Sequence, residues 1–274
     1  MGVPSGRFDG HAHVFHKSLP MVQKQRYFPK ENAYLDCYIE LLKEHQLDGA
    51  LLVQPSFLGT DNTYLLSNII TANSITEYKF RGVVAVQPDI SFTALREMNQ
   101  HGIVGIRFNL IGQPTPDFQS AEWLGLFEKV NLLGWFVELH IEGTRLSGLL
   151  PYLLTLCETV VIDHFGLPDA DAPLDCPGFR AILDSADRNL FVKTSAPFRV
   201  FPGNDSKEAA AKTRTIYQHL WDALGPDKLV WGSDWPWTMF ENRHDFAETM
   251  NWLPASSSAD LSEQASRLNV YLEA

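Results

Sequence analysis

Short apolar segments alternate with longer helical patterns along most of this 274-residue chain, and the alternation limits the folds open to it. Two segments, Ala50–Val53 and Gly82–Val86, are almost continuously apolar, which is typical of strands buried on both faces of a parallel sheet. Strands separated by helices predict βαβ units. Eight such units form a (β/α)8 barrel, which needs about 250 residues. We therefore predict an α/β fold in which residues 1–274 form one barrel domain. The expected strands are Phe8–Phe15, Gly49–Pro55, Phe80–Pro88, Gly102–Leu110, Gly134–Ile141, Thr159–Phe165, Leu190–Pro197 and Leu229–Pro236.

An open, doubly wound sheet is the competing architecture. It would usually carry a glycine-rich phosphate-binding turn after an early strand, and the sequence has none. We expect His16–Asn32 to form an active-site loop, Phe198–Ser206 to form a second loop, and the last twenty residues to include an amphipathic closing helix. The expected helices between strands are Tyr34–His45, Phe92–His101, Ala121–Leu133, Leu146–Cys157 and Ala209–Leu224.

The charge balance argues against several classes of partner. A formal net charge of −11 disfavours nucleic acid and anionic membranes, although arginines in a pocket could still bind a small anionic substrate. Cys37, Cys157 and Cys176 are odd in number and lack CxxC spacing, so we expect reduced cytoplasmic thiols. The N-terminus has no apolar signal core, and no run approaches the ~18 apolar residues of a membrane span. The sequence predicts no oligomeric state.

The strongest chemical signal is His11-Ala-His13 at the end of the first expected strand. Side chains two residues apart on a strand point the same way, so both imidazoles should face the mouth of the barrel. Two polar core histidines are the structural alternative. The preceding Asp9-Gly10 and the position on the first strand of a barrel favour the functional interpretation.

Three later strands also end in polar residues. Asp234 follows the eighth strand, where a carboxylate reaches the active-site face, although it could instead cap a helix. His164 ends the sixth strand, and the strand alternation predicts that Asp163 points the opposite way. Glu138 and His140 share one face of the fifth strand.

In this order, these residues resemble the amidohydrolase superfamily. That family carries an HxH pair on strand one, histidines after strands five and six, and an aspartate after strand eight. The matching residues here are His11 and His13, His140 and His164, and Asp234. The resemblance extends from Asp9 to Tyr271.

Further motifs narrow the resemblance to the lactonase branch, which includes 2-pyrone-4,6-dicarboxylate lactonases, sulfomuconolactone hydrolases and sugar lactonases. They are Gln54-Pro-Ser56, Gly59–Asn62, Gly105–Asn109, Asp163–Gly166, Ser195–Arg199 and Trp231–Pro236. The resemblance implies an enzyme that hydrolyses a lactone ester, with pyrone dicarboxylate enzymes as the nearest comparison.

The number of metal ions is left open between none and one. Many superfamily members hold two metals with a carboxylated lysine on strand four. The fourth strand here ends in Ile106-Arg107-Phe108, and arginine stays cationic; Lys193 on strand seven is not at the usual bridging position. One Zn²⁺ could bind His11, His13, His140 and Asp234 with an open position for water. We favour no metal, because Arg107 resembles the pyrone dicarboxylate branch, which is understood to work without one; that branch has a tyrosine where this chain has His140, which favours zinc.

In the metal-free mechanism, Asp234 acts as general base toward water. His11, His13 and His164 donate hydrogen bonds to the carbonyl oxygen as its charge develops. With zinc, the ion would polarise the carbonyl and acidify its bound water.

Arg107 and Arg199 are candidate clamps for substrate carboxylates, since a guanidinium matches a carboxylate in a bidentate fork. Arg107 could instead form a structural salt bridge with Glu138, and Arg199 could be a solvated loop charge. Neutral hydrogen bonds from Gln54, Ser56 and Asn62, together with His140, could complete the substrate pocket.

The sequence leaves three other functions open, and the first is a sugar-lactone hydrolase of the same branch. A zinc-dependent decarboxylase of a muconate or aromatic acid shares the HxH pair, the later histidine and the aspartate, but needs the metal. A small-molecule binder without activity could keep the same residues, although its intact His and Asp set argues against this.

Overall fold

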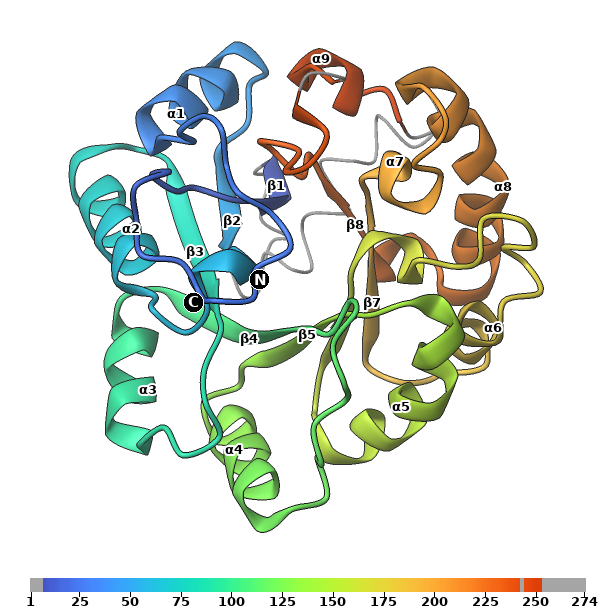
Figure 1. Cartoon of the computed structure of the whole chain (residues 1–274), viewed down its shortest axis with the longest axis horizontal. Helices are drawn as coiled ribbons and strands as arrows, with labels where there is room; N and C mark the ends of the chain where they lie inside the picture. The colour runs from blue at the N-terminus through green and yellow to red at the C-terminus, as the bar shows by residue number, and fades with distance from the viewer. Residues whose placement is uncertain (1–6, 242–243, 253–274) are drawn as a thin grey trace, which may run out of the picture.

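Eight parallel strands surrounded by helices form the barrel predicted from the sequence (Figure 1). The computed structural model describes residues 7–241 and 244–252. Each strand pairs with the next in chain order, from β1 to β8, and every pairing is parallel. The strands are β1 Phe8–Ala12, β2 Gly49–Val53, β3 Lys79–Val84, β4 Ile103–Asn109, β5 Phe136–His140, β6 Val160–Ile162, β7 Leu190–Ser195 and β8 Leu229–Gly232.

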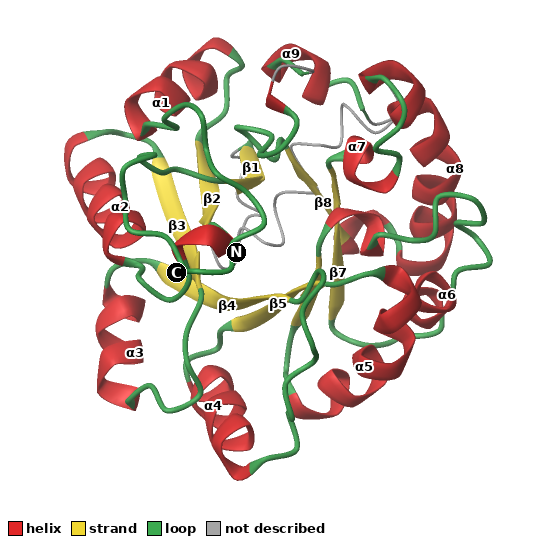
Figure 2. Ribbon diagram, viewed as in Figure 1, coloured by secondary structure: helices red, strands yellow, loops and turns green. Residues whose placement is uncertain are grey.

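The helices lie on the outside of the strands (Figure 2). They are α1 Leu35–Glu44, α2 Thr63–Ile75, α3 Phe92–Gln100, α4 Ala121–Leu132, α5 Gly143–Leu156, α6 Pro177–Leu183, α7 Pro197–Val200, α8 Ser206–Leu224 and α9 Phe246–Thr249, with 3₁₀ turns at Ser56–Leu58, His164–Gly166 and Pro226–Lys228. Each expected strand and helix overlaps an observed one. The expected C-terminal helix lies outside the described residues. Among the described helices, none has the length and apolar character needed to cross a bilayer.

Four described helices were not expected from the sequence, and the shortest include the one-turn helix α9. The α2 helix contains β-branched and short polar residues, which are weak helix formers, and α6 is short and follows a turn-rich segment. The segment Phe198–Ser206, expected to be a loop, begins within the one-turn helix α7.

The interior of the barrel changes character from one end to the other. An apolar cluster fills its lower part and includes Leu51, Val53, Val83, Val104, Phe136, Val161, Phe191 and Val230. Two residues further along their strands, Glu138 follows Phe136 and Lys193 follows Phe191, and both side chains are fully buried. Because side chains alternate along a strand, these charged groups lie one step closer to the carboxyl ends of the strands.

Asp9 joins the first and last strands of the barrel. Its Oδ1 accepts hydrogen bonds from the backbone nitrogens of Ser233 (2.8 Å) and His11 (3.0 Å), and its Oδ2 accepts one from the Tyr38 hydroxyl (2.6 Å). Backbone bonds from Asp234 N to His11 O and from His13 N to Trp235 O, both 2.8 Å, continue this seam. The same seam therefore closes the barrel and holds its histidine pair beside Asp234.

We expect Asp9→Asn to lower the free energy of unfolding by about 2–3 kcal/mol, because the amide would place a buried N–H group where the carboxylate accepts. Urea unfolding monitored by circular dichroism measures the change. Substitution of the exposed Asp187 by Asn is the matched control and should change stability by under about 0.5 kcal/mol. Equal stability of the two variants would contradict this role for Asp9.

Candidate active site

A cavity opens at the carboxyl ends of the strands, the face on which barrel enzymes carry their active sites. The space between its walls is about 540 Å³ when the open, solvent-filled mouth is included. Its walls bring together predicted site residues from distant parts of the sequence: His13, Ser56, Arg107, His140, His164, Arg199 and Asp234.

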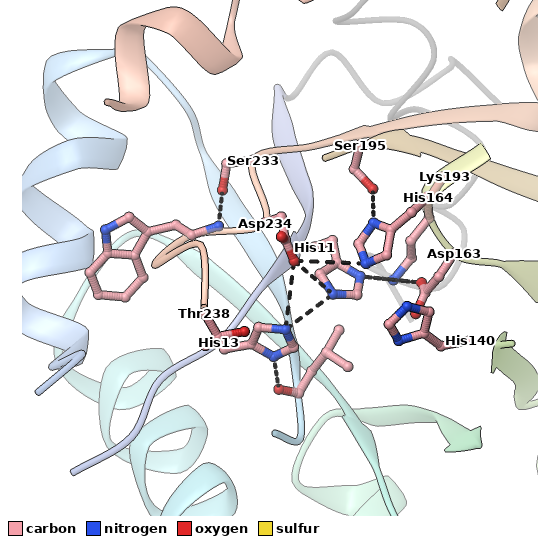
Figure 3. Close-up of polar contacts among 12 residues, drawn as sticks. His11, His13, His140, Asp163, His164, Lys193, Ser195, Ser233, Asp234 and Thr238 are labelled. Atoms are coloured by element: carbon pink, nitrogen blue, oxygen red, sulfur yellow. Dashed lines mark hydrogen bonds and ion pairs between the residues drawn. The ribbon is translucent and has the colours of Figure 1, made fainter. Parts of the chain in front are cut away.

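Three imidazoles and one carboxylate converge on one another (Figure 3), and all of them except His11 line the cavity. Asp234 Oδ1 lies 3.6 Å from His11 Nε2, 3.8 Å from His13 Nε2 and 3.8 Å from His164 Nε2. The two nitrogens of the HxH pair are 3.3 Å apart. The four predicted catalytic residues thus form one cluster.

Asp234 has one oxygen fixed and one oxygen unpaired. Oδ2 accepts a 2.7 Å hydrogen bond from Arg199 Nε, whereas the buried Oδ1 has no hydrogen-bond partner among the described residues. Burial raises the pKa of Asp234, and Arg199 partly offsets this rise. Asp234 has a φ of 57°, a left-handed conformation that is uncommon outside glycine and is often found at functional sites.

Backbone and side-chain contacts orient two of the histidines. His13 Nδ1 lies 2.7 Å from the Val53 carbonyl oxygen, which can only accept, so this nitrogen carries the proton. Burial and the Arg107 cation lower the pKa of His13 to about 3, and its Nε2 is therefore an acceptor. His164 Nδ1 is 2.8 Å from the Ser195 hydroxyl.

The prediction that Asp163 points away from His164 is wrong. Strand β6 ends at Ile162, and His164 has a φ of 49°, so the alternation of side chains does not continue through this pair. Both residues are buried within the site, and Asp163 Oδ1 lies 3.4 Å from His11 Nδ1.

Arg107 forms ion pairs within the barrel. Its Nε and Nη2 donate to Asp163 Oδ2 at 3.0 and 2.7 Å, and Nε also lies 3.0 Å from Glu138 Oε1. Its Nη2 lies 3.1 Å from His140 Nδ1. The structural salt bridge considered from the sequence is therefore present, although Arg107 also contributes to the cavity wall.

The neutral residues predicted to bind substrate lie in different places. Ser56 is exposed in the cavity wall. The Gln54 amide donates to the carbonyl oxygens of Gly59 and Asp61, and Asn62 bonds both backbone groups of Ala85. Neither Gln54 nor Asn62 is among the residues that line the cavity.

The sequence did not single out several cavity residues. Arg26 and Tyr27 come from the segment His16–Asn32, which confirms that this loop reaches the site. Arg26 Nη2 donates to Asn109 Oδ1 at 3.1 Å, and the Tyr27 hydroxyl bonds the Glu241 carboxylate. Three arginines, Arg26, Arg107 and Arg199, thus surround one cavity; an arginine in an irregular loop gives no periodic signal that could have identified it.

Within residues 7–241 and 244–252, two groups of side chains have the spacing to hold a metal ion: His11, His13 and Asp234, and His11, Asp163 and His164. For tetrahedral zinc with bonds of about 2.0–2.1 Å, ligand atoms lie roughly 3.3 Å apart, close to the distances in the first group. The hydrogen bonds of His11 and His140 fit a metal ion less well than these distances do, because a ring nitrogen that carries a proton cannot bind a metal. His11 Nδ1 lies 2.9 Å from Lys193 Nζ, and His140 Nδ1 lies beside an arginine, so in both rings the remaining nitrogen carries the proton. His140, the fourth ligand predicted from the sequence, belongs to neither group.

Comparison with known proteins agrees with this arrangement. Residues 8–267 match the Amidohydrolase family model, and the chain belongs to that family. It is 27% identical to a 4-sulfomuconolactone hydrolase from Hydrogenophaga intermedia, covering 85% of this chain and 76% of that protein. It is 26% identical to a 2-pyrone-4,6-dicarboxylate hydrolase from Comamonas testosteroni, covering 85% and 78% of the two chains. A crystal structure from Pseudomonas putida, named for a 2-pyrone-4,6-dicarboxylic acid hydrolase, is 35% identical, covers 98% of each chain and has a TM-score of 0.86.

We expect Arg199→Gln to raise the pKa of Asp234 further above its ordinary value of 3.8, because the variant loses the cation that stabilises the carboxylate. Carbon-13 NMR titration of the aspartate carboxyl groups measures the change. Substitution of the exposed Arg96 by Gln removes the same charge far from the site and should leave the titration unchanged. An unaltered or lowered Asp234 pKa in the Arg199 variant would show that this ion pair does not control the carboxylate.

Proposed function

We propose that this protein hydrolyses a lactone bearing carboxylate groups, of the 2-pyrone-4,6-dicarboxylate kind, by direct attack of water on the ester carbonyl. The observation that carries the proposal is the difference between the two carboxylate oxygens of Asp234. One of its oxygens is fixed by Arg199, while the other is buried, unpaired and beside three imidazoles. The similarity to lactone hydrolases supports the choice of bond.

Asp234 and His13 position the attacking water. Asp234 Oδ1 and His13 Nε2 are both acceptors, 3.8 Å apart, and together can receive the two protons of one water molecule. Asp234 takes one proton as the water oxygen bonds to the carbonyl carbon. A base with a raised pKa is better matched to this transfer than an ordinary carboxylate.

His11 stabilises the charge that then develops on the carbonyl oxygen. Its Nε2–H has only a long contact of 3.3 Å with His13 Nε2, and when substrate is bound it can donate to this oxygen instead, which leaves His13 Nε2 to the water. When the tetrahedral intermediate collapses, the ring C–O bond breaks and Asp234 returns its proton to the leaving oxygen. The products are a new carboxylic acid, which loses its proton to solvent, and an enol or alcohol on the opened ring. His164 borders the same space and is a further candidate donor.

The arginines select for an anionic substrate. Arg199 bonds Asp234 and Thr238 through Nε and Nη2, so among the described residues its Nη1 group is left to bind a substrate carboxylate. Partial burial and the cations of Arg199 and Arg107 lower the pKa of Arg26, as expected for like charges gathered around one cavity. A dicarboxylate would relieve this repulsion. Ser56 and His140 could add hydrogen bonds to it.

The reaction is proposed to need no metal. We expect chelator-treated protein to keep its activity on 2-pyrone-4,6-dicarboxylate, followed by ultraviolet absorbance, and Asp234→Asn to lower kcat about 10²–10⁴-fold through loss of the base. Chelator-treated enzyme with zinc restored is the control. Activity that returns only with zinc would reject the metal-free reaction, and zinc-dependent release of CO2 would indicate a decarboxylase.

We expect Arg26→Gln to raise KM for the dicarboxylate about 10- to 100-fold, the cost of one hydrogen bond between charged groups, with little change in kcat. The KM for a pyrone with one carboxylate should change less. Lys24→Gln, which removes the same charge from the same loop outside the cavity wall, is the control. Equal effects of the two substitutions would remove Arg26 from substrate binding.

A further inference from the structure

Lys193 is a buried cation that does not reach the cavity. Its side chain is fully buried on β7. Its Nζ lies 2.5 Å from Glu138 Oε2 and 3.7 Å from Asp163 Oδ1. Two carboxylates thus compensate an ammonium group that would otherwise be costly to bury. The third neighbour of Nζ is His11 Nδ1, at 2.9 Å.

The contact with Lys193 determines which nitrogen of His11 carries the proton. An ammonium group has three N–H donors and no acceptor, so His11 Nδ1 must accept. A neutral imidazole has one N–H, which then lies on Nε2. Asp163 Oδ1 and Glu138 Oε1 could instead receive a proton from Nδ1, but they are farther away, at 3.4 and 3.8 Å, and neither oxygen makes a hydrogen bond among the described residues.

The contact between His11 Nε2 and His13 independently indicates that the His11 proton lies on Nε2. His13 donates from Nδ1 to the Val53 carbonyl, which leaves its Nε2 as an acceptor. That acceptor lies 3.3 Å from His11 Nε2, and two bare nitrogens would not face each other at this distance without a proton between them. The donors therefore run in one direction, from Lys193 to His11, from His11 to His13, and from His13 to the β2 backbone (Figure 3).

We propose that Lys193 is a positioning residue that holds His11 as its Nε2–H tautomer. His11 then presents a hydrogen-bond donor toward the substrate and has no lone pair on Nε2 to offer a metal ion. The catalytic use of this donor rests on the proposed lactone hydrolysis, whereas the tautomer and the metal preference do not.

Removal of the ammonium should reverse the tautomer. Asp163 Oδ1 would become the nearest partner of His11 Nδ1 and would accept its proton. Nε2 would then carry a lone pair directed at the space shared with His13 and Asp234. Histidine ligands of metals commonly donate their other ring N–H to a carboxylate in this way. Lys193, which lies below the site, would therefore determine whether His11 Nε2 is a hydrogen-bond donor or a zinc ligand.

The first experiment uses the unmodified protein. Histidine tautomers are read from long-range proton–nitrogen NMR correlations of protein labelled with nitrogen-15 histidine, and the His11 signals are assigned by their loss in His11→Asn. We expect the proton of His11 on Nε2 and that of His13 on Nδ1. A His11 proton on Nδ1 in the unmodified protein would overturn the proposal, whether or not the protein hydrolyses lactones.

The second experiment removes Lys193 while keeping the buried charges balanced. In the double variant Lys193→Met, Glu138→Gln, one cation and one anion are lost together. We expect its His11 proton on Nδ1, zinc binding by calorimetry at least 10-fold tighter than in the unmodified protein, and kcat lowered about 10²–10³-fold, as for loss of one oxyanion donor. The matched control is Glu138→Gln alone, which retains Lys193 and should retain the Nε2–H tautomer and weak zinc binding.

The outcomes of these experiments separate the two hypotheses. An unchanged His11 tautomer or unchanged zinc affinity in the folded double variant would overturn the role of Lys193. The expected tautomers and zinc affinities, in a protein that hydrolyses no lactone, would reject the proposed function and leave the role of Lys193 intact. If the double variant does not fold, the spectrum of the unmodified protein still decides the tautomer.

Discussion

The candidate site depends on a pair of cations and a pair of anions enclosed in the barrel. Arg107 and Lys193 alternate with Glu138 and Asp163 at buried positions, so their formal charges cancel. Removing one partner from such a group usually costs about 3–5 kcal/mol, because the remaining charge is left uncompensated. The imidazoles above rest on this layer: His11 contacts Lys193, and His140 contacts Arg107. Because the lysine and the arginine can only donate, Nδ1 of each ring accepts, and the proton of each imidazole lies on Nε2, the nitrogen that does not contact the charged layer.

The barrel architecture explains why this layer lies where it does. Parallel strands in register bring side chains from separate parts of the chain to the same level, as with Arg107 beside Glu138 on neighbouring strands. Below this level the interior is apolar and well packed, which supplies stability without competing polar groups. Above it the strands end, and the chain leaves regular geometry at His164 and Asp234, where the left-handed backbone turns both side chains inward.

The sequence predicted the barrel and the convergence of His11, His13, His164 and Asp234, because both follow from local patterns. Buried parallel strands read as apolar runs, and polar residues at their ends share one face of the barrel. It did not predict α2, whose weak helix formers are held by burial of Leu65, Ile69 and Ala72 rather than by propensity. It misplaced the side chain of Asp163, because the left-handed backbone of His164 interrupts the alternation of side chains expected along a strand. The roles of Arg26 and Lys193 depend on contacts between residues far apart in sequence, with Lys193 and His11 separated by 182 positions, and no local pattern encodes them.

The balanced charge layer also limits how a barrel of this kind could acquire a different chemistry over evolutionary time. A lineage that lost Lys193 first would leave two buried carboxylates facing a single arginine among these four residues. The resulting loss of about 3–5 kcal/mol would be a large part of the 5–15 kcal/mol that typically keeps a domain folded. A change of His11 from hydrogen-bond donor to metal ligand without loss of stability therefore requires two coordinated substitutions, or a metal ion that binds when the lysine is lost. Descendants of such a protein would be separated by single variants of low stability, even though their active-site residues are the same.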